Sequence, residues 1–197
     1  MTNTSASGGY LAPSTTSAAQ GVSLEDFLQA VFVGLSGLPG GLVRPRWQPK
    51  PPPQPSRDTT WISLGITRRR SLGYVDEAHD SSGDGQQTAE HHQQLEILVS
   101  AYGPDGAAVS DMIETSIQIR QNRDALYSAQ VGFVEATDLL TTSDLLNQEW
   151  VPRHDRTFIL SRAVRRTYPI LNILSAQGQF VSDRAGAAPQ NFIVEQT

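Results

Sequence analysis

The chain contains no cysteine and a single lysine, Lys50. The absence of cysteine excludes disulfides, thiolate metal sites and cysteine nucleophiles, and it suits a reducing compartment. Lys50 stands between prolines, which excludes a phosphate-binding loop of the glycine-lysine type and leaves no lysine for Schiff-base chemistry. No apolar run is long enough to span a bilayer, and the amino terminus lacks the basic-then-apolar order of a signal peptide. We therefore expect a soluble protein, made in the cytoplasm, with no membrane partner.

Histidine is also scarce, with four residues in the chain: His79, His91, His92 and His154. Three of them lie near acidic residues, but His91 and His92 would point to opposite faces of a strand, so they could not easily share a metal ion. The segment DSSGDG at 80–85 resembles the start of a calcium loop, although His91 stands where a bidentate glutamate belongs. A solvated acidic loop is the favoured interpretation. We expect no metal, no cofactor and no catalytic residue, and hence no enzyme.

Six prolines fall within the eighteen residues from Arg44 to Trp61. Proline lacks an N–H group and fixes φ, so this segment can be neither helix nor the interior of a sheet, and 44–60 is predicted to be a stiff, extended connector. A plain spacer is one interpretation. Trp47 and Trp61 favour a strap that lies across another surface, because each indole can bury a large apolar face.

The net charge of −5 conceals a separation of charge along the chain. Residues 1–43 carry −2, residues 44–70 carry +6, residues 71–119 carry −9, and residues 120–197 are neutral. Adjacent blocks of opposite sign favour pairing within the molecule or between copies over one continuous nucleic-acid footprint. Fourteen of the fifteen basic residues are arginine, which suits fixed bidentate contacts at interfaces.

Hydrophobic periodicity predicts one folded domain at 23–181, with an extended amino-terminal arm at 1–22 and a carboxyl-terminal arm at 182–197. Two main helices are expected: one begins at Ser23, with Asp26 completing a capping box, and stops at Gly37; the other runs from a cap at Asp105 to about Arg123. The strands are expected at 61–67, 92–102, 131–137, 157–165 and 170–181, with an acidic loop or hairpin at 76–90 and a helical turn at 143–147. This order predicts an α+β fold, in which the helices pack on an antiparallel or mixed sheet.

Five stretches of the sequence carry a family resemblance. They are GLPGGLVRPRWQPKPPPQP at 37–55, WISLGI at 61–66, SAYGPDG at 100–106, IRQNRDAL at 119–126 and VRRTYPILNILSAQG at 164–178. Together they resemble the neck or tail-terminator proteins of tailed bacteriophages, in particular the neck-terminator family with a Pro-Arg-Trp-Gln-Pro connector. The resemblance spans about 24–178, and the two ends of the chain show no match.

The resemblance implies a structural virion protein at the junction of head and tail. Such proteins form a ring, typically six-fold, on the end of the tail tube; the ring stops tube growth and docks the tail on the connector of the filled head. The implied partners are further copies of the chain in a hexamer, the tail tube protein and the head-tail connector or adaptor proteins, with the sheath protein as a further candidate. DNA would pass through the lumen without specific binding.

Two sets of charged or aromatic residues are candidates for roles in such a ring. The subunit-interface candidates are Arg44, Arg46, Trp47, Trp61, Arg68, Arg69, Arg70, Arg120, Arg123, Arg165 and Arg166. The lumen-facing candidates, whose charge would keep DNA off the wall, are Asp76, Glu77, Asp80, Asp84 and Glu90. The alternative function is a nucleic-acid-binding neck or connector component, whose arginine strands grip the end of the packaged genome.

Overall fold

The structure is a computed structural model that describes residues 3–15, 19–146, 148–173, 175–181 and 188–195. The internal contacts divide the chain into two compact units. The large unit consists of Ser17–Asp76 and Glu90–Arg165, and the small unit consists of Met1–Thr16, Glu77–Ala89 and Arg166–Thr197. None of the helices in the described residues is long and apolar enough to cross a membrane.

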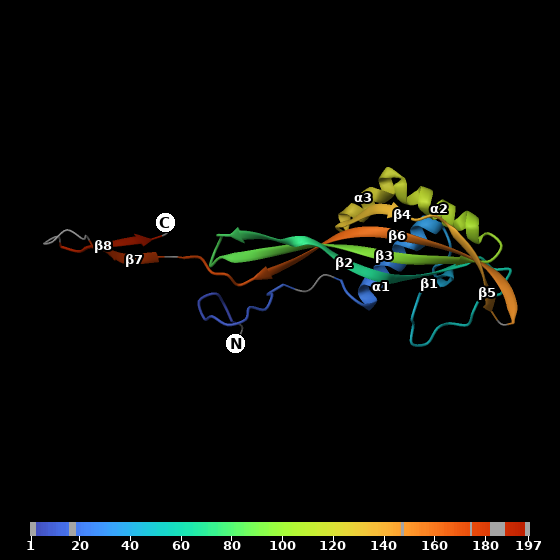
Figure 1. The fold of residues 1–197 in the computed structure, drawn as a ribbon, viewed down its shortest axis with the longest axis horizontal. Helices are drawn as coiled ribbons and strands as arrows, with labels where there is room; N and C mark the ends of the chain where they lie inside the picture. Colours follow the sequence, from blue (N-terminus) through green and yellow to red (C-terminus); the bar gives the residue numbers. More distant parts are fainter. Residues whose placement is uncertain (1–2, 16–18, 147, 174, 182–187, 196–197) are drawn as a thin grey trace. The chain divides into compact units, whose positions relative to one another are not determined.

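The fold is α+β, as the sequence predicts (Figure 1). The helices are α1 (Val22–Ser36), the short 3-10 helix η1 (Gly40–Leu42), α2 (Gly106–Gln118) and α3 (Arg120–Ser128). The strands are β1 (Val43–Pro45), β2 (Trp61–Asp80), β3 (Gln86–Tyr102), β4 (Val131–Ala136), β5 (Leu140–Leu146), β6 (Glu149–Tyr168), β7 (Ser175–Phe180) and β8 (Gln190–Glu195). Strands β1 to β6 form one sheet in the order β1-β2-β3-β6-β4, and β5 also pairs with β6.

The large sheet is mixed, with mostly antiparallel neighbours. Strand β1 runs parallel to β2, whereas β4 and β5 run antiparallel to β6. Side-chain bonds fix the direction of β2 against β3: Thr67 Oγ1 donates to the Glu96 carbonyl at 3.2 Å, and Ser71 Oγ lies 3.1 Å from His91 Nε2. The residue numbers on β3 fall as those on β2 rise, so the pair is an antiparallel hairpin. Of the predicted loop or hairpin at 76–90, only residues 81–85 lie outside a strand.

The hydrophobic core lies between the three helices and one face of the sheet. Alternate residues of β2 and β3 point to that face, as their buried side chains show: Ile62, Leu64, Leu95, Ile97 and Val99. The helices contribute Leu24, Leu28, Phe32 and Leu35 from α1, Val109, Ile113 and Ile117 from α2, and Leu126 from α3. At the centre, the Phe32 ring meets the Phe158 ring edge-on at a centroid distance of 5.4 Å.

The predicted ends of the helices need correction. Helix α1 begins at Val22 after Gly21 and has no side-chain cap, so the capping box predicted at Ser23 and Asp26 is wrong; Ser23 Oγ donates to the Gln20 carbonyl instead. The predicted helix from 105 to 123 is interrupted at Ile119, whose φ of −64° and ψ of 133° are extended. Two helices, α2 and α3, therefore stand where one was expected.

Two further predictions about the carboxyl-terminal half are wrong. The helical turn predicted at 143–147 is a strand over its described residues, because β5 pairs with β6 from Leu140 opposite Asp155 to Leu146 opposite Glu149. The last strand does not begin at Ile170, since 170–173 are not in a strand and β7 starts at Ser175.

The small unit is built from hydrogen bonds rather than from a core. Ser5 N donates to the Pro169 carbonyl at 3.1 Å, and Ser14 N donates to the Thr167 carbonyl at 2.8 Å, so part of the predicted amino-terminal arm lies along residues 167–169. Strands β7 and β8 form a separate two-stranded sheet. None of the side chains that the structure describes in this unit is buried.

Candidate functional site

The proline-rich connector leaves the sheet at β1 and returns at β2. Its described prolines are exposed or half-buried, and few bonds hold it. Arg44 Nη1 donates to the Pro53 carbonyl at 2.8 Å, and Arg46 N donates to the Leu64 carbonyl at 2.7 Å, which extends the β1–β2 pairing by one residue. The segment thus starts on the sheet and then forms an open strap over 48–56.

The two connector tryptophans have different environments. Trp61 stacks on Tyr102 with ring centroids 4.3 Å apart and planes 8° apart, and the Arg44 guanidinium lies 5.5 Å from the Trp61 ring. Trp47 has φ of 57° and is 69% exposed. Its ring lies over Gly65, where an added Cβ would stand 2.7 Å from Trp47 Cζ3. Glycine at 65 therefore makes room for an indole whose other side is open.

A polar chain behind the strap joins three strands. Arg46 Nη2 donates to Ser100 Oγ on β3, and Ser100 Oγ donates to Asp155 on β6. Asp155 Oδ2 also accepts from Arg153 Nε at 3.0 Å, and Arg153 Nη1 donates to Asp144 on β5 at 2.9 Å. Sequence reasoning found Arg46 but missed the other four residues, because only the register of β3, β5 and β6 brings them together.

Burial and nearby charges shift the pKa of two groups at this polar chain, Tyr102 and Arg153. Burial raises the pKa of the Tyr102 hydroxyl, against a smaller lowering by Arg46 and Arg153. Burial acts to lower the pKa of Arg153, but the hydrogen bond that Arg153 donates to Asp144 and the charge of Asp155 outweigh it, so the pKa is raised. Arg153 therefore stays charged at any pH at which the protein is folded, and it bridges Asp144 and Asp155 behind the start of the strap.

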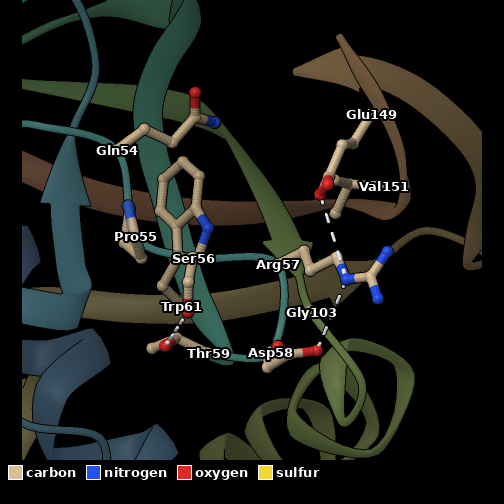
Figure 2. Close-up of a pocket in the computed structure, with 10 residues that line it drawn as sticks. All are labelled: Gln54, Pro55, Ser56, Arg57, Asp58, Thr59, Trp61, Gly103, Glu149 and Val151. Carbon is tan, nitrogen blue, oxygen red and sulfur yellow. Dashed lines mark hydrogen bonds and ion pairs between the residues drawn. The ribbon is translucent and has the colours of Figure 1, made fainter. Parts of the chain in front are cut away.

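A cavity of about 360 Å³ opens under the returning half of the strap (Figure 2). Trp61 forms one wall, and Figure 2 shows Arg57 between Asp58 and Glu149. The Arg57 Nε atom is 3.6 Å from Asp58 Oδ1 and 3.9 Å from Glu149 Oε2, and all three side chains are more than half exposed. Such exposed pairs stabilise a fold little, so Arg57 and Glu149 remain available to a neighbouring molecule.

Gly103 fixes where the strap returns to the sheet. It has φ of +91°, and a Cβ there would stand 2.5 Å from the Thr59 carbonyl oxygen. We expect Gly103→Ala to lower the free energy of unfolding by about 2 kcal/mol or more. The added methyl group strains the backbone at a positive φ and clashes with the Thr59 backbone, which cannot move aside easily. Thermal unfolding followed by circular dichroism measures it.

Gly73 supplies the matched control for that substitution. Its φ is +66°, but nothing lies within 4 Å of a Cβ built there. Gly73→Ala should therefore cost only the left-handed penalty of about 1 kcal/mol. Equal losses at the two positions would show that the contact between Gly103 and Thr59 does not hold the strap.

The three consecutive arginines lie on an exposed part of β2. Arg68 Nη1 is 3.4 Å from Glu96 Oε1, and Arg69 Nη1 donates to Gln20 Oε1 at 2.7 Å. Arg70 makes no hydrogen bond or ion pair with the residues that the structure describes. The segment thus presents a partly unneutralised positive charge to solvent.

The other arginine candidates are engaged inside the chain to different extents. Arg165 forms an ion pair with Glu90, which was a lumen-facing candidate. Arg120 Nε is 3.9 Å from Asp124 Oδ2 one turn along α3, and Arg123 donates to the Tyr127 hydroxyl at 3.1 Å. Arg166 belongs to the small unit rather than the large one. Arg165, Arg120 and Arg123 therefore have partners within the chain, and the interface role of the candidates stays a prediction.

Of the five acidic candidates, Asp76 and Glu90 belong to the large unit, and Glu77, Asp80 and Asp84 belong to the small unit. Asn172 fixes the turn of the β2–β3 hairpin: its side chain donates to the Ser81 carbonyl at 2.8 Å and to the Gly83 carbonyl at 3.0 Å. Sequence reasoning missed Asn172, which is 91 residues from Ser81. The acidic turn is thus tied down rather than a free loop.

Asp80 gives a pH prediction. Its carboxylate accepts from Ser82 N at 3.0 Å and Gln86 Nε2 at 3.2 Å, and the backbone bond from Ser82 lowers its pKa below 3.8. The bonds to the carboxylate therefore stabilise the turn fully above the unfolded pKa, and the stabilisation is lost as the pH falls through the folded pKa. An NMR titration of Asp80 and of the Ser82 amide should give a midpoint below 3.8. A midpoint at or above that value would contradict the bonded turn, and Asp80→Asn should abolish the transition of the Ser82 amide.

Among the residues that the structure describes, no group of three or more histidine, aspartate or glutamate side chains could hold a metal ion. Arg156 is an additional charged residue that sequence reasoning missed. It is 6% exposed on β6 and binds Asp111 at 3.0 Å and Glu114, both on α2. This pair ties the helix layer to the sheet, which is a structural role.

Residues 22–184 match the model of the phage neck terminator protein family. The match covers most of the chain, so the chain belongs to this family, whose members are structural proteins of the phage neck. The resemblance seen in the sequence is thereby confirmed. No curated protein sequence matches the chain.

Proposed function

We propose that copies of this chain form a ring, six-fold in the simplest case, on the end of a phage tail tube. The ring terminates the tube and joins the tail to the head connector. Family membership supports a place in the neck and contacts with other tail or head proteins. The partners in this proposal are the tube protein, the connector or adaptor proteins and, where the tail has one, the sheath protein.

The main support for a ring is that the small unit, over its described residues, has no buried core in the single chain. Its described side chains are all at least partly exposed when the chain is taken alone. A unit without a core of its own does not bury enough apolar surface to offset the entropy lost on ordering. Contact with a neighbouring copy would supply the missing burial, as expected of heterologous contacts that close into a ring.

Two surfaces of the large unit fit such contacts. The strap at 48–56 and the open side of Trp47 are available to an adjacent copy, since most of the strap is exposed and Trp47 is 69% exposed. Arg68, Arg69 and Arg70 would meet acidic residues of a neighbour. Asp76 lies six positions after Arg70 on the same strand, which is about 20 Å. These two residues therefore do not pair within one chain, but they can pair between copies.

The remaining acidic residues suit a different surface in the same proposal. Glu77, Asp80 and Asp84 of the hairpin turn are exposed. Facing the lumen, they would repel the phosphate backbone and let DNA pass without binding. A density map of the neck that put this hairpin on the outer wall of the ring would contradict the lumen role alone.

One specific observation favours the alternative function of gripping the genome end, namely three adjacent exposed arginines on β2. Phosphate contacts release counterions, so such binding would weaken steeply with salt. Filter binding of duplex ends at several salt concentrations tests it. We expect weak binding, because the chain carries a net charge of −5.

The experiment that tests the proposed function compares negative-stain images of lysates from the wild-type phage and from a phage with an early stop codon in this gene. We expect filled heads beside detached tails of abnormal or uncontrolled length in the mutant. Supplying the chain from a plasmid should restore normal particles. Complete particles of normal length that fail only to deliver DNA would contradict tail termination and favour the genome-end alternative.

A further inference from the structure

One edge of β2 is open beyond Leu64. In the part of the sheet that the structure describes, β1 is the strand on that side, and its last residue lies opposite Leu64. The Leu64 carbonyl accepts from Arg46 N at 2.7 Å, so it points outward. Backbone groups that point to one side recur at every second residue of a strand, so those of Ile66, Arg68 and Arg70 also point outward. Unpaired N–H and C=O groups of this kind are a template for a further strand.

A cavity of about 320 Å³ lies beside this open edge. Ile66, Arg68 and Arg69 line it from β2, Glu25 lines it from α1, and Trp47 lines it from the connector. Two arginines face one glutamate, so the cavity is positive overall. Trp47 is 69% exposed and adds an apolar surface. The edge therefore offers main-chain groups, positive charge and an indole to an incoming segment, as sheet edges that accept a further strand do.

The opposite end of the sheet carries complementary groups. Strand β4 is the last strand there, at the other end of the order from β1 and β2. Glu135 on β4 and Asp138 just after it are exposed, and neither side chain forms a hydrogen bond or ion pair with the residues that the structure describes. Val134 is 45% exposed and Leu140 is 61% exposed. Unpaired acids thus stand beside open apolar side chains at this end.

We propose that the open edge of β2 in one copy of the ring receives residues 134–140 of the next copy. The arginines at 68–70 bind Glu135 and Asp138, and Trp47 packs on Leu140. The register of β4 shifts between Phe133 and Glu135, so main-chain pairing along this edge is short. The charge pairs therefore fix the register of the contact.

Two observations select a second copy in this head-to-tail orientation. The two surfaces lie at opposite ends of one sheet, so each copy uses a different surface toward each neighbour, and the contact repeats around a ring. Two β2 edges facing each other would bring three arginines against three arginines, and like charges opposite one another destabilise a strand pair. The inference rests on the proposed ring and names the contact that closes it.

The absence of cysteine from the chain allows a clean test. Arg70→Cys combined with Glu135→Cys places one thiol at each end of the sheet, while the other charged residues of the contact are kept. The control combines Arg70→Cys with Asp26→Cys, at an exposed residue of α1. Each variant is supplied from a plasmid to a phage that lacks the gene, and purified particles are treated with a flexible bismaleimide. We expect a ladder of multiples of 21.4 kDa, at least about five-fold stronger than from the control, because a head-to-tail contact links each copy to the next.

Four outcomes would overturn the contact between edges: no product, dimers without longer products, a ladder of equal strength from the control, or a product with another virion protein. Electron microscopy of the same particles separates this failure from that of the proposed function. If the chain is found at the tube end of particles with normal tails and the ladder does not form, the ring stands and the edge contact fails. If the chain is absent from the tube end, the proposed function fails.

Exchanging the charges gives a second readout of the same contact. Glutamates at all three positions 68–70 should block the joining of tails to heads. Adding Glu135→Arg and Asp138→Arg to that variant restores attraction with the signs reversed, and should raise the yield of joined particles at least about ten-fold. Asp26→Arg with Asp105→Arg, at two exposed acids away from β4, is the matched control and should not rescue joining. Equal rescue by both pairs, or rescue by neither, would contradict the edge contact.

Discussion

A phage whose only copy of this chain carries Arg68→Glu, Arg69→Glu and Arg70→Glu should produce detached heads and tails. The three substitutions change the net charge from −5 to −11 and turn the positive segment of β2 negative. Juxtaposed like charges at an interface cost several kcal/mol, and the cost recurs at every contact around a ring. Arg68 would also lose its Glu96 partner. The ratio of joined particles to free tails in negative stain measures the effect.

Two controls accompany this variant. All three side chains are exposed, so the thermal midpoint of the purified variant should stay near that of the wild type. The triple variant Arg68→Lys, Arg69→Lys and Arg70→Lys keeps the positive charge, so it should join tails to heads at a rate close to wild type. Normal particles from the glutamate variant would show that residues 68–70 do not lie at the interface between copies.

The largest effect on stability is expected from Phe158→Ala. Phe158 is fully buried on β6 and contacts Phe32 of α1, so the substitution opens a cavity where the helix layer meets the sheet. The free energy of unfolding should fall by about 3–5 kcal/mol. For a chain of this size each kcal/mol lowers the midpoint by about 2–4 °C. Thermal unfolding followed by circular dichroism tests it.

Leu140→Ala is the control for the core substitution. Leu140 is 61% exposed on β5, and its truncation should change the free energy of unfolding by no more than about 0.5 kcal/mol. A loss below about 1 kcal/mol for Phe158→Ala would mean that the aromatic pair is not the centre of the core.

Periodicity was sufficient to predict the core of the large unit. Leu28, Phe32 and Leu35 recur at helical spacing, and Leu95, Ile97 and Val99 alternate as a half-buried strand does. These patterns identify the buried face of each helix or strand, whatever the tertiary arrangement around it. The α+β fold followed from their order.

Features set by tertiary contacts could not be predicted in this way. Nothing in the local sequence at Ile119 predicts an extended residue between two helices. The interruption lets both α2 and α3 place apolar side chains in the core. Strand β5 exists because it pairs with β6, although 143–147 alone also suits a turn. In both places tertiary contacts override the local secondary-structure propensity.

The residues of the candidate surfaces show the same difference between local signals and tertiary contacts. Arg46 and Trp61 were singled out from residue type as subunit-interface candidates, since a proline-rich segment with indoles points to a strap, and that role stays a prediction. Their partners Ser100 and Tyr102 carry no signal of their own, because an ordinary strand serine or tyrosine becomes specific only through register. Asn172 was missed for the same reason.

The most direct test of the ring is a reconstruction of the neck from purified particles. We predict six copies of the chain in one ring at the head-proximal end of the tube, with the strap at 48–56 and the small unit of each copy against its neighbours. Copies distributed along the tube, or a single copy on the genome end, would contradict the account.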